Sequence, residues 1–246
     1  GDLRDLHLSI RRQRQMCIRD SYSRYRNSAG QRVRTALNIK KIPYEYIVVE
    51  TVGIDEGVPN ARNSISKEDY LLINPQGLMP TLVIDGERVV QSTALVEFIE
   101  DAFEGPSLFP KDLVARARTR AFGQVIACEM HAVGVRRVRR NLMEKHGFSK
   151  KKLKVWYDNW LHHGYQTLET LMTQRSVKTH FCYDDKPTIG DIYLVPQLYN
   201  SRLFEIDLSA YPTLCDIEQR CREIPAFEKA MPYNQPDYPE NPEGFV

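Results

Sequence analysis

The chain has 246 residues, of which 42% are hydrophobic and 27% charged, and its formal net charge is +2. These values are typical of a soluble globular protein of one or two domains, and they give no reason to expect a polyanionic partner such as nucleic acid. No apolar run approaches the roughly 18 residues that a membrane-spanning helix needs. The five cysteines lack paired C-x-x-C and Cys/His metal spacings, so we expect free thiols, no metal and a reducing, cytoplasmic location.

Regular structure is predicted to begin at about Asp20. Residues 1–19 have no apolar core of the kind a secretory signal carries, and we expect them to be an extension outside the domain. Asp20–Tyr25 and Tyr44–Val49 are predicted strands, and Arg32–Lys41, with its start at Ser28, is a predicted helix between them. Two strands joined by a helix pair in parallel.

A β-hairpin is predicted further along the chain. The turn signal Asp85-Gly86 separates two short strands, Thr81–Ile84 and Arg88–Gln91, which should pair antiparallel. Pro80 precedes the first of them, and Pro is tolerated in a sheet only at a strand start or an edge. The polar residues Gln91-Ser92-Thr93 then cap a predicted helix that begins at Ala94. The stretch Val52–Ile65, with two Gly and a Pro, is a predicted loop.

Helical periodicity replaces strand patterns beyond Pro110. The predicted helices cover Leu113–Lys145, Ser149–Gln174, Gly190–Leu203 and Leu214–Arg222. Thr188 and Asp191 have the spacing of a capping box. Core positions are expected for Cys128, Trp156 and Trp160. The last stretch, 232–246, contains four prolines and is predicted to be an exposed tail.

Ser28 is the candidate catalytic residue. It lies at a helix start, where backbone N–H groups are unpaired and the helix dipole favours negative charge, so a thiolate would be stabilised there. Ser is also a favoured N-cap in any helix. From this stretch alone, a plain N-cap is the preferred interpretation.

Three motifs change that interpretation. They are R-x-S-x-x-x-R-V-R from Arg26, N-P-x-x-x-x-P-x-L from Asn74 and I-D-G-x-x-x-x-Q-S from Ile84. Together they resemble the zeta class of glutathione transferases, the maleylacetoacetate and maleylpyruvate isomerases, and the resemblance extends over roughly 20–237. It implies an α/β plus all-α fold. A thioredoxin-like domain with a mixed four-stranded sheet would span 20–105, and an all-helical substrate-binding domain 112–231.

The resemblance also assigns a cofactor and site residues. Glutathione would be bound by Ser28, Met79, Pro80, Gln91 and Ser92, with Pro80 in the cis form and the γ-glutamyl carboxylate at the helix start. The implied catalytic residues are Ser28, Arg26 and His131. The implied substrate-binding residues are Arg26, Arg137 and Arg202. The spacing of His131 and Arg137 also places both near one helix face, with Arg137 turned inward.

The implied activity is a cis-trans isomerisation of a maleyl keto acid in aromatic catabolism, by reversible addition of the glutathione thiolate. The implied partners are a small dicarboxylate keto acid and a second copy of the chain in a homodimer. Gly134 and Val135 stand where relatives carry an Asn pair, which leaves the keto acid open.

Two other functions remain open. One is a glutathione transferase that conjugates or dehalogenates small electrophiles. The other is a non-catalytic module that binds a protein partner, although the intact motif residues argue against it. The basic run 136–140 is better explained as a solvated helix face than as a nucleic-acid site.

Overall fold

The computed structural model describes residues 19–50 and 63–240, which divide into two compact units. The first unit combines 19–103, less the gap, with 232–240, and the second is 104–231. Within the described ranges, no helix is long and apolar enough to cross a membrane. The expected extension at 1–19, apart from its last residue, and most of the predicted loop lie outside the described residues.

A five-stranded mixed sheet in the order β3-β2-β1-β4-β5 forms the centre of the first unit. Its strands are β1 (Arg19–Ser23), β2 (Glu45–Val49), β3 (Ser64–Ile65), β4 (Thr81–Ile84) and β5 (Glu87–Val90). The predicted parallel pairing of β1 with β2 and the antiparallel hairpin of β4 and β5 are confirmed. The predicted strand number of four is wrong. A fifth strand, β3, pairs in parallel with β2, and its two residues are too few to show a strand pattern in the sequence.

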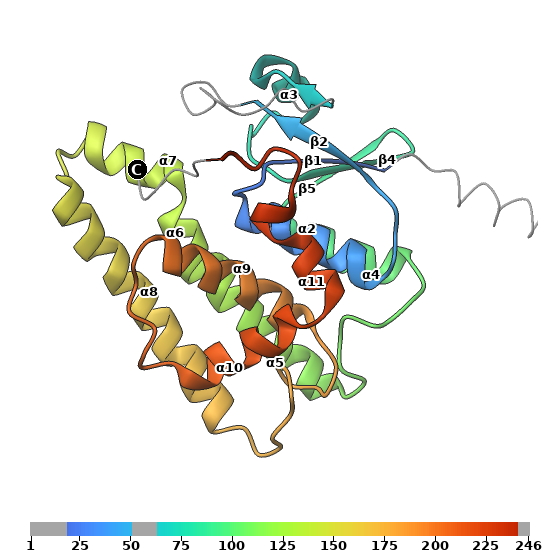
Figure 1. Ribbon diagram of the computed structural model, residues 1–246, viewed down its shortest axis with the longest axis vertical. Coiled ribbons are helices and arrows are strands. Elements are labelled where there is room, and N and C mark those ends of the chain that lie inside the picture. Colours follow the sequence, from blue (N-terminus) through green and yellow to red (C-terminus); the bar gives the residue numbers. More distant parts are fainter. Residues whose placement is uncertain (1–18, 51–62, 241–246) are drawn as a thin grey trace, which may run out of the picture. The chain divides into compact units, whose positions relative to one another are not determined.

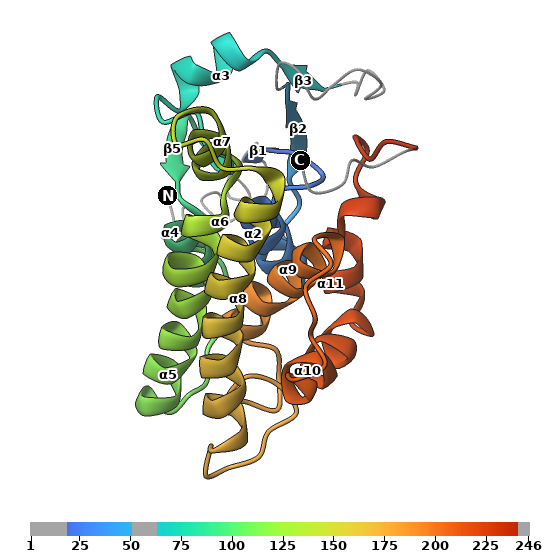
Figure 2. The ribbon, with the colours of Figure 1, turned by 90° about the vertical axis from the view of Figure 1, so that its left-hand side faces the viewer.

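Three helices accompany this sheet. They are α2 (Ser28–Ile39), α3 (Lys67–Ile73) and α4 (Ser92–Ala102). Figure 1 and Figure 2 show α2 and α4 together on one side of the sheet and α3 on the other. Val33 and Leu37 of α2 and Leu95 and Ile99 of α4 are fully buried, because each pair recurs at helical spacing on the face toward the sheet.

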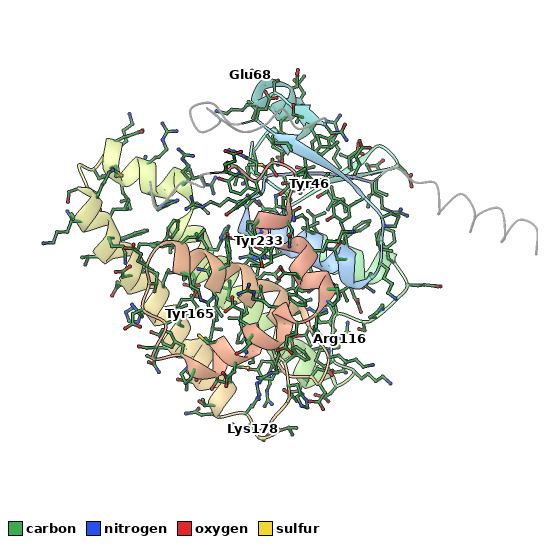
Figure 3. All side chains as sticks on the ribbon, in the orientation of Figure 1. Tyr46, Glu68, Arg116, Tyr165, Lys178 and Tyr233 are labelled. Carbon is green, nitrogen blue, oxygen red and sulfur yellow. The ribbon has the colours of Figure 1, made fainter. Side chains whose placement is uncertain are left out.

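Over its described residues, the regular structure of the second unit consists of helices and no strands. Its helices are α5 (Leu113–Gln124), the π-helix η1 (Val125–His131), α6 (Ala132–Gly134), α7 (Arg136–Glu144), α8 (Lys150–Thr173), α9 (Ile189–Leu203), α10 (Pro212–Arg222) and α11 (Pro225–Ala230). In Figure 2, α8 runs beside the segment formed by η1 and α6. Tyr165 of α8, labelled in Figure 3, is fully buried and donates to the Gln197 carbonyl at 3.2 Å.

The predicted capping box at α9 is confirmed. The Thr188 amide donates to Asp191 Oδ2 at 2.7 Å, and the Gly190 amide donates to Thr188 Oγ1 at 3.2 Å. Asp191 Oδ1 also accepts from the Cys182 amide at 2.9 Å, so one buried carboxylate fixes both the helix start and the preceding loop.

None of the three expected core positions is fully buried. Cys128 is exposed, Trp160 is 38% exposed and Trp156 is half-buried. The buried stripe of α8 passes through Leu153, Tyr157 and Leu161, four residues apart, and Trp160 lies beside that stripe.

The end of the chain also differs from the prediction. Residues 232–240, which we name the C-terminal segment, begin with the 3₁₀ turn η2 (Pro232–Asn234) and belong to the first unit. Gln235 is 8% and Asp237 0% exposed, so the predicted exposed tail is wrong over these residues. The proline-rich composition indicated coil, but composition cannot show that Asp237 forms hydrogen bonds with Tyr25 and Tyr46, which lie far away in the sequence. Residues 241–246 lie outside the described residues.

Candidate functional site

The start of α2 assigns different positions to Asn27 and Ser28. Asn27 is the N-cap, in an extended conformation, and its side-chain oxygen accepts from the Gly30 amide. Ser28 is the first residue of the helix and is half-buried. The plain N-cap interpretation of Ser28 is therefore wrong, because Asn27 satisfies the backbone donor that a cap serves.

The loop between β1 and α2 is held closely. A Cβ added at Gly30 would overlap the Ser23 hydroxyl, so only glycine allows the helix start to approach the strand end so closely. The buried Arg34 donates from Nη1 to Ser23 Oγ at 3.2 Å and from Nη2 to the Tyr25 carbonyl at 3.4 Å. These contacts fix the segment that leads into Ser28.

A second loop carries Met79-Pro80, whose peptide bond is cis, as the resemblance implied. A buried hydrogen-bond network supports this loop from below. Asn74 Nδ2 and Tyr70 Oη both donate to the Leu78 carbonyl, at 2.6 and 2.8 Å, and Tyr70 Oη lies 2.7 Å from Thr81 Oγ1. Tyr70 was missed by the sequence analysis, since an aromatic residue in an unpredicted helix gives no sign of such a role.

The start of α4 presents Gln91 and Ser92. Gln91 has a φ of 71° and occupies the N-cap position, but its side chain makes no cap bond and donates instead to Gln76 Oε1 at 2.7 Å. The expected side-chain cap at Gln91 is therefore wrong. Ser92 is the first helical residue, and its buried hydroxyl accepts from Arg32 Nη1 at 3.3 Å. A guanidinium beside a helix N-terminus favours an anion there.

Strand register brings these three features to one end of the sheet. Thr81, directly after Pro80, is paired with Tyr22 on one side and Val90 on the other. The end of β1, which leads to Ser28, and the end of β5, which leads to Gln91, therefore flank the start of β4. Two helix N-termini and the cis-Pro loop thus share one edge of the first unit, an arrangement that suits a ligand with a carboxylate and an ionisable thiol.

The second unit holds His131 and Arg137, but not on one helix face. His131 ends the π-helix, and Val135, with ψ 150°, interrupts the chain before α7 begins. The spacing argument required a continuous helix, so it is wrong here. Arg137 is exposed and not turned inward, whereas the guanidinium of Arg139 lies 4.8 Å from the centre of the Phe204 ring.

Arg202 forms an ion pair within the second unit. Its Nη1 and Nη2 lie 2.7 and 2.5 Å from the two oxygens of Glu218, whose side chain is 3% exposed. The hydrogen bond to Glu218 raises the pKa of Arg202. Because one carboxylate already occupies the fork of this guanidinium, substrate binding by Arg202 competes with a structural role.

Arg26 lies half-buried in the loop before Ser28, in the first unit. The expected convergence of Arg26, Arg137 and Arg202 on one ligand stays a prediction, as do the catalytic roles of Arg26, Ser28 and His131. Met79, Pro80, Gln91 and Ser92 are brought together with Ser28 by the sheet register, while their contacts with glutathione stay predictions.

Known proteins are similar to this chain in both sequence and fold. Residues 28–102 match the family model of the glutathione S-transferase N-terminal domain. The chain is 32% identical to maleylpyruvate isomerase of Ralstonia sp., over 88% of this chain and 98% of the relative. It is 33% identical to maleylacetoacetate isomerase of Pseudomonas aeruginosa, over 89% and 98%.

Three solved structures are similar over most of their length. The holo maleylpyruvate isomerase, described as a bacterial zeta-class glutathione S-transferase, is 32% identical with a TM-score of 0.80, covering 89% of this chain and 99% of that one. The Methylobacterium extorquens maleylacetoacetate isomerase with bound malonate and glutathione is 34% identical with a TM-score of 0.81, and the match covers 89% of this chain and 99% of that one. The Anaeromyxobacter dehalogenans maleylacetoacetate isomerase with bound dicarboxyethyl glutathione and citrate is 32% identical with a TM-score of 0.76, and the match covers 91% of this chain and 98% of that one.

Proposed function

This chain belongs to the zeta class of glutathione transferases, and we propose that it is a glutathione-dependent cis-trans isomerase of a maleyl keto acid. The observation that carries the proposal is the meeting of two helix N-termini and the cis-Pro loop at one end of the sheet. Relatives about one-third identical are named for this activity, and two of the similar structures hold glutathione or a glutathione derivative.

The residues at this end of the sheet fit glutathione. Ser92 and the N-terminus of α4, with Arg32 beside them, would hold the γ-glutamyl carboxylate, and the Gln91 side chain is exposed at the same place. The backbone of Met79, next to the cis-Pro bond, would pair with the cysteinyl part of the tripeptide.

The thiol would lie at the start of α2. When bound, glutathione supplies a thiolate that adds reversibly to the activated double bond and so permits rotation about it. Ser28 would donate a hydrogen bond to the sulfur, and the α2 N-terminus would lower the pKa of the thiol, as helix N-termini do for cysteine. Asn27 leaves the Ser28 hydroxyl available, because Asn27 supplies the cap.

An arginine of the first unit is proposed to hold a substrate carboxylate. Arg26, half-buried in the loop before Ser28, would offer a planar fork that matches a carboxylate bidentately. The substrate-binding roles of Arg137 and Arg202 stay predictions. Fixed positive charge also stabilises the negative charge that develops on the keto acid during the reaction. A cytoplasmic homodimer is part of the proposal, and light scattering of the purified protein tests the dimer.

The test is incubation with maleylacetoacetate and with maleylpyruvate, following the fumaryl product. Product should form with catalytic glutathione, glutathione should be recovered unchanged, and S-methylglutathione should give no turnover because it lacks a free thiol. Full turnover with the methylated analogue, or without any thiol, would overturn the proposal. Stoichiometric consumption of glutathione would assign the chain to the conjugating transferases.

A further inference from the structure

A buried carboxylate of the C-terminal segment contacts the loop that leads into Ser28. Asp237 Oδ2 accepts from the Tyr25 amide at 2.8 Å, and Asp237 Oδ1 accepts from the Tyr46 hydroxyl at 3.0 Å. Burial raises the pKa of Tyr46 well above its usual value, so its hydroxyl stays protonated and donates. Figure 3 labels Tyr46 on β2 and Tyr233 in the C-terminal segment, and both belong to the first unit.

The Tyr25 peptide is held from both sides. Tyr25 lies two residues beyond the end of β1, where the sheet ladder has stopped, and Asp237 takes its amide. Arg34 donates to its carbonyl at 3.4 Å. The Tyr25 ring meets the Tyr238 ring edge to face, with centroids 5.5 Å apart. One residue of the loop is thus fixed through its amide, its carbonyl and its ring.

Ser28 follows this fixed residue closely. Only Arg26 and Asn27 separate Tyr25 from Ser28, so a shift of the Tyr25 peptide is passed on through a short connection. The Asn27 carbonyl also accepts from the Gln31 amide at 2.8 Å, which ties the same connection to the first turn of α2. Asp237 therefore joins two elements of the first unit, because one of its oxygens binds Tyr46 of β2 and the other binds the residue that leads into the Ser28 loop.

We propose that Asp237 is a positioning residue for the thiol site, acting from the opposite end of the chain through the Tyr25 peptide. The inference rests on the proposed function of Ser28. Asp237 sets the place of the Arg26–Ser28 stretch and so the hydrogen bond that Ser28 gives to the bound sulfur. A displacement of about 1 Å at such a site is enough to lower turnover about a hundredfold.

The test compares Asp237→Asn with Glu240→Gln in the full chain. Glu240 is an exposed carboxylate of the same segment, so its conversion to the amide is the matched control. Hydrogen exchange of the amides in residues 24–28, without ligand, reports the loop. Ultraviolet titration reports the thiol pKa of bound glutathione, and steady-state kinetics reports kcat and KM separately.

In Asp237→Asn, the amide hydrogens of residues 24–28 should exchange faster than in the parent. The thiol pKa of bound glutathione should rise, and kcat should fall roughly 10-fold to 100-fold with a smaller change in KM. Glu240→Gln should match the parent in all three. Parental exchange, thiol pKa and kcat in Asp237→Asn would overturn the positioning role alone, with the proposed function intact. A parent that does not isomerise would overturn the proposed function and the positioning role together. If Asp237→Asn does not fold, Asp237→Glu carries the same measurements, because it keeps the charge and moves the oxygens by one methylene.

Discussion

At the scale of single residues, the start of α2 separates two tasks that one serine often combines. Asn27 satisfies the Gly30 amide, so the Ser28 hydroxyl is not used by the helix. A hydroxyl in the first turn that is not needed for capping can serve a ligand. The helix N-terminus lends its partial positive charge to the same place.

This separation gives opposite expectations for two neighbouring substitutions. Ser28→Ala should lower kcat about 10-fold to 100-fold and raise the thiol pKa of bound glutathione, because a hydrogen bond to a charged group contributes about 1.5 to 3 kcal/mol. Its melting temperature should match the parent. Asn27→Ala should cost about 1 kcal/mol of stability through the lost cap.

Thermal unfolding and ultraviolet titration of the two variants check these expectations. An equal loss of stability in both would mean that Ser28 shares the capping role. An unchanged thiol pKa in Ser28→Ala would mean that the helix start alone ionises glutathione.

At the scale of elements, α10 is fastened to its neighbours by two carboxylates. Glu169 of α8 accepts from the Thr213 and Leu214 amides at 3.0 and 3.1 Å, and so caps the start of α10 from another helix. The two carboxylate oxygens of Glu218 in α10 pair with Nη1 and Nη2 of Arg202 in α9. The ion pair thereby joins α9 to α10.

Arg202→Ala distinguishes a structural role from a substrate role. Removing the arginine leaves Glu218 buried without its partner, and we expect about 1 to 3 kcal/mol of destabilisation, less than for a fully buried pair because Arg202 is half-exposed. Arg140→Ala is the control. Its pair with Glu144 is exposed on both sides, so its loss should cost under about 0.5 kcal/mol.

Urea unfolding of both variants gives the stabilities, and kcat/KM is measured for the diacid and for an uncharged electrophile. Similar changes with both substrates agree with the structural role. A loss confined to the diacid, at unchanged stability, would show that Arg202 binds substrate despite its pairing.

The elements that could be predicted from the sequence are those with local signals. The hairpin, the parallel pair and the capping box each depend on residues close together in the chain, through a turn, a helix connection or a box spacing. The strand β3 has no such signal. The break at Val135 was missed because helices lie directly on both sides of it.

The site was predicted less completely for the same reason. Ser28, Pro80 and Ser92 stand in recognisable motifs, whereas the groups that hold them act over long separations. Tyr25 and Asp237 are 212 residues apart, and Arg32 and Ser92 are 60 apart. No local sequence pattern predicts such pairs. The ion pair between Arg202 and Glu218 could not be predicted for the same reason.

At the scale of the whole molecule, the chain returns to its first unit after completing the second. Figure 1 shows this return as the dark red segment that follows α11. The first unit is therefore complete only when the C-terminal segment is present, although most of its core comes from residues before 104.

A truncation after Met231 tests this dependence. It removes the Asp237 carboxylate from Tyr25 and Tyr46, and a hydrogen bond to a charged group contributes about 1.5 to 3 kcal/mol, so the first unit should lose at least that much stability. Glu240→Gln in the full chain should keep the stability of the parent, because Glu240 is exposed and Asp237 stays in place. Urea unfolding midpoints of the truncated chain and of this variant give the comparison, and equal midpoints would show that the segment is dispensable.

The backbone of Gln91 has a further consequence, for the evolution of thermostability. With φ at 71°, the backbone of Gln91 has a conformation that glycine adopts at no steric cost. Gln91→Gly should therefore unfold at a temperature equal to or above that of the parent, while calorimetry shows weaker glutathione binding. Gln91→Ala should lose affinity without that compensation. Selection for heat resistance alone should thus favour glycine at position 91, and selection for turnover should restore glutamine.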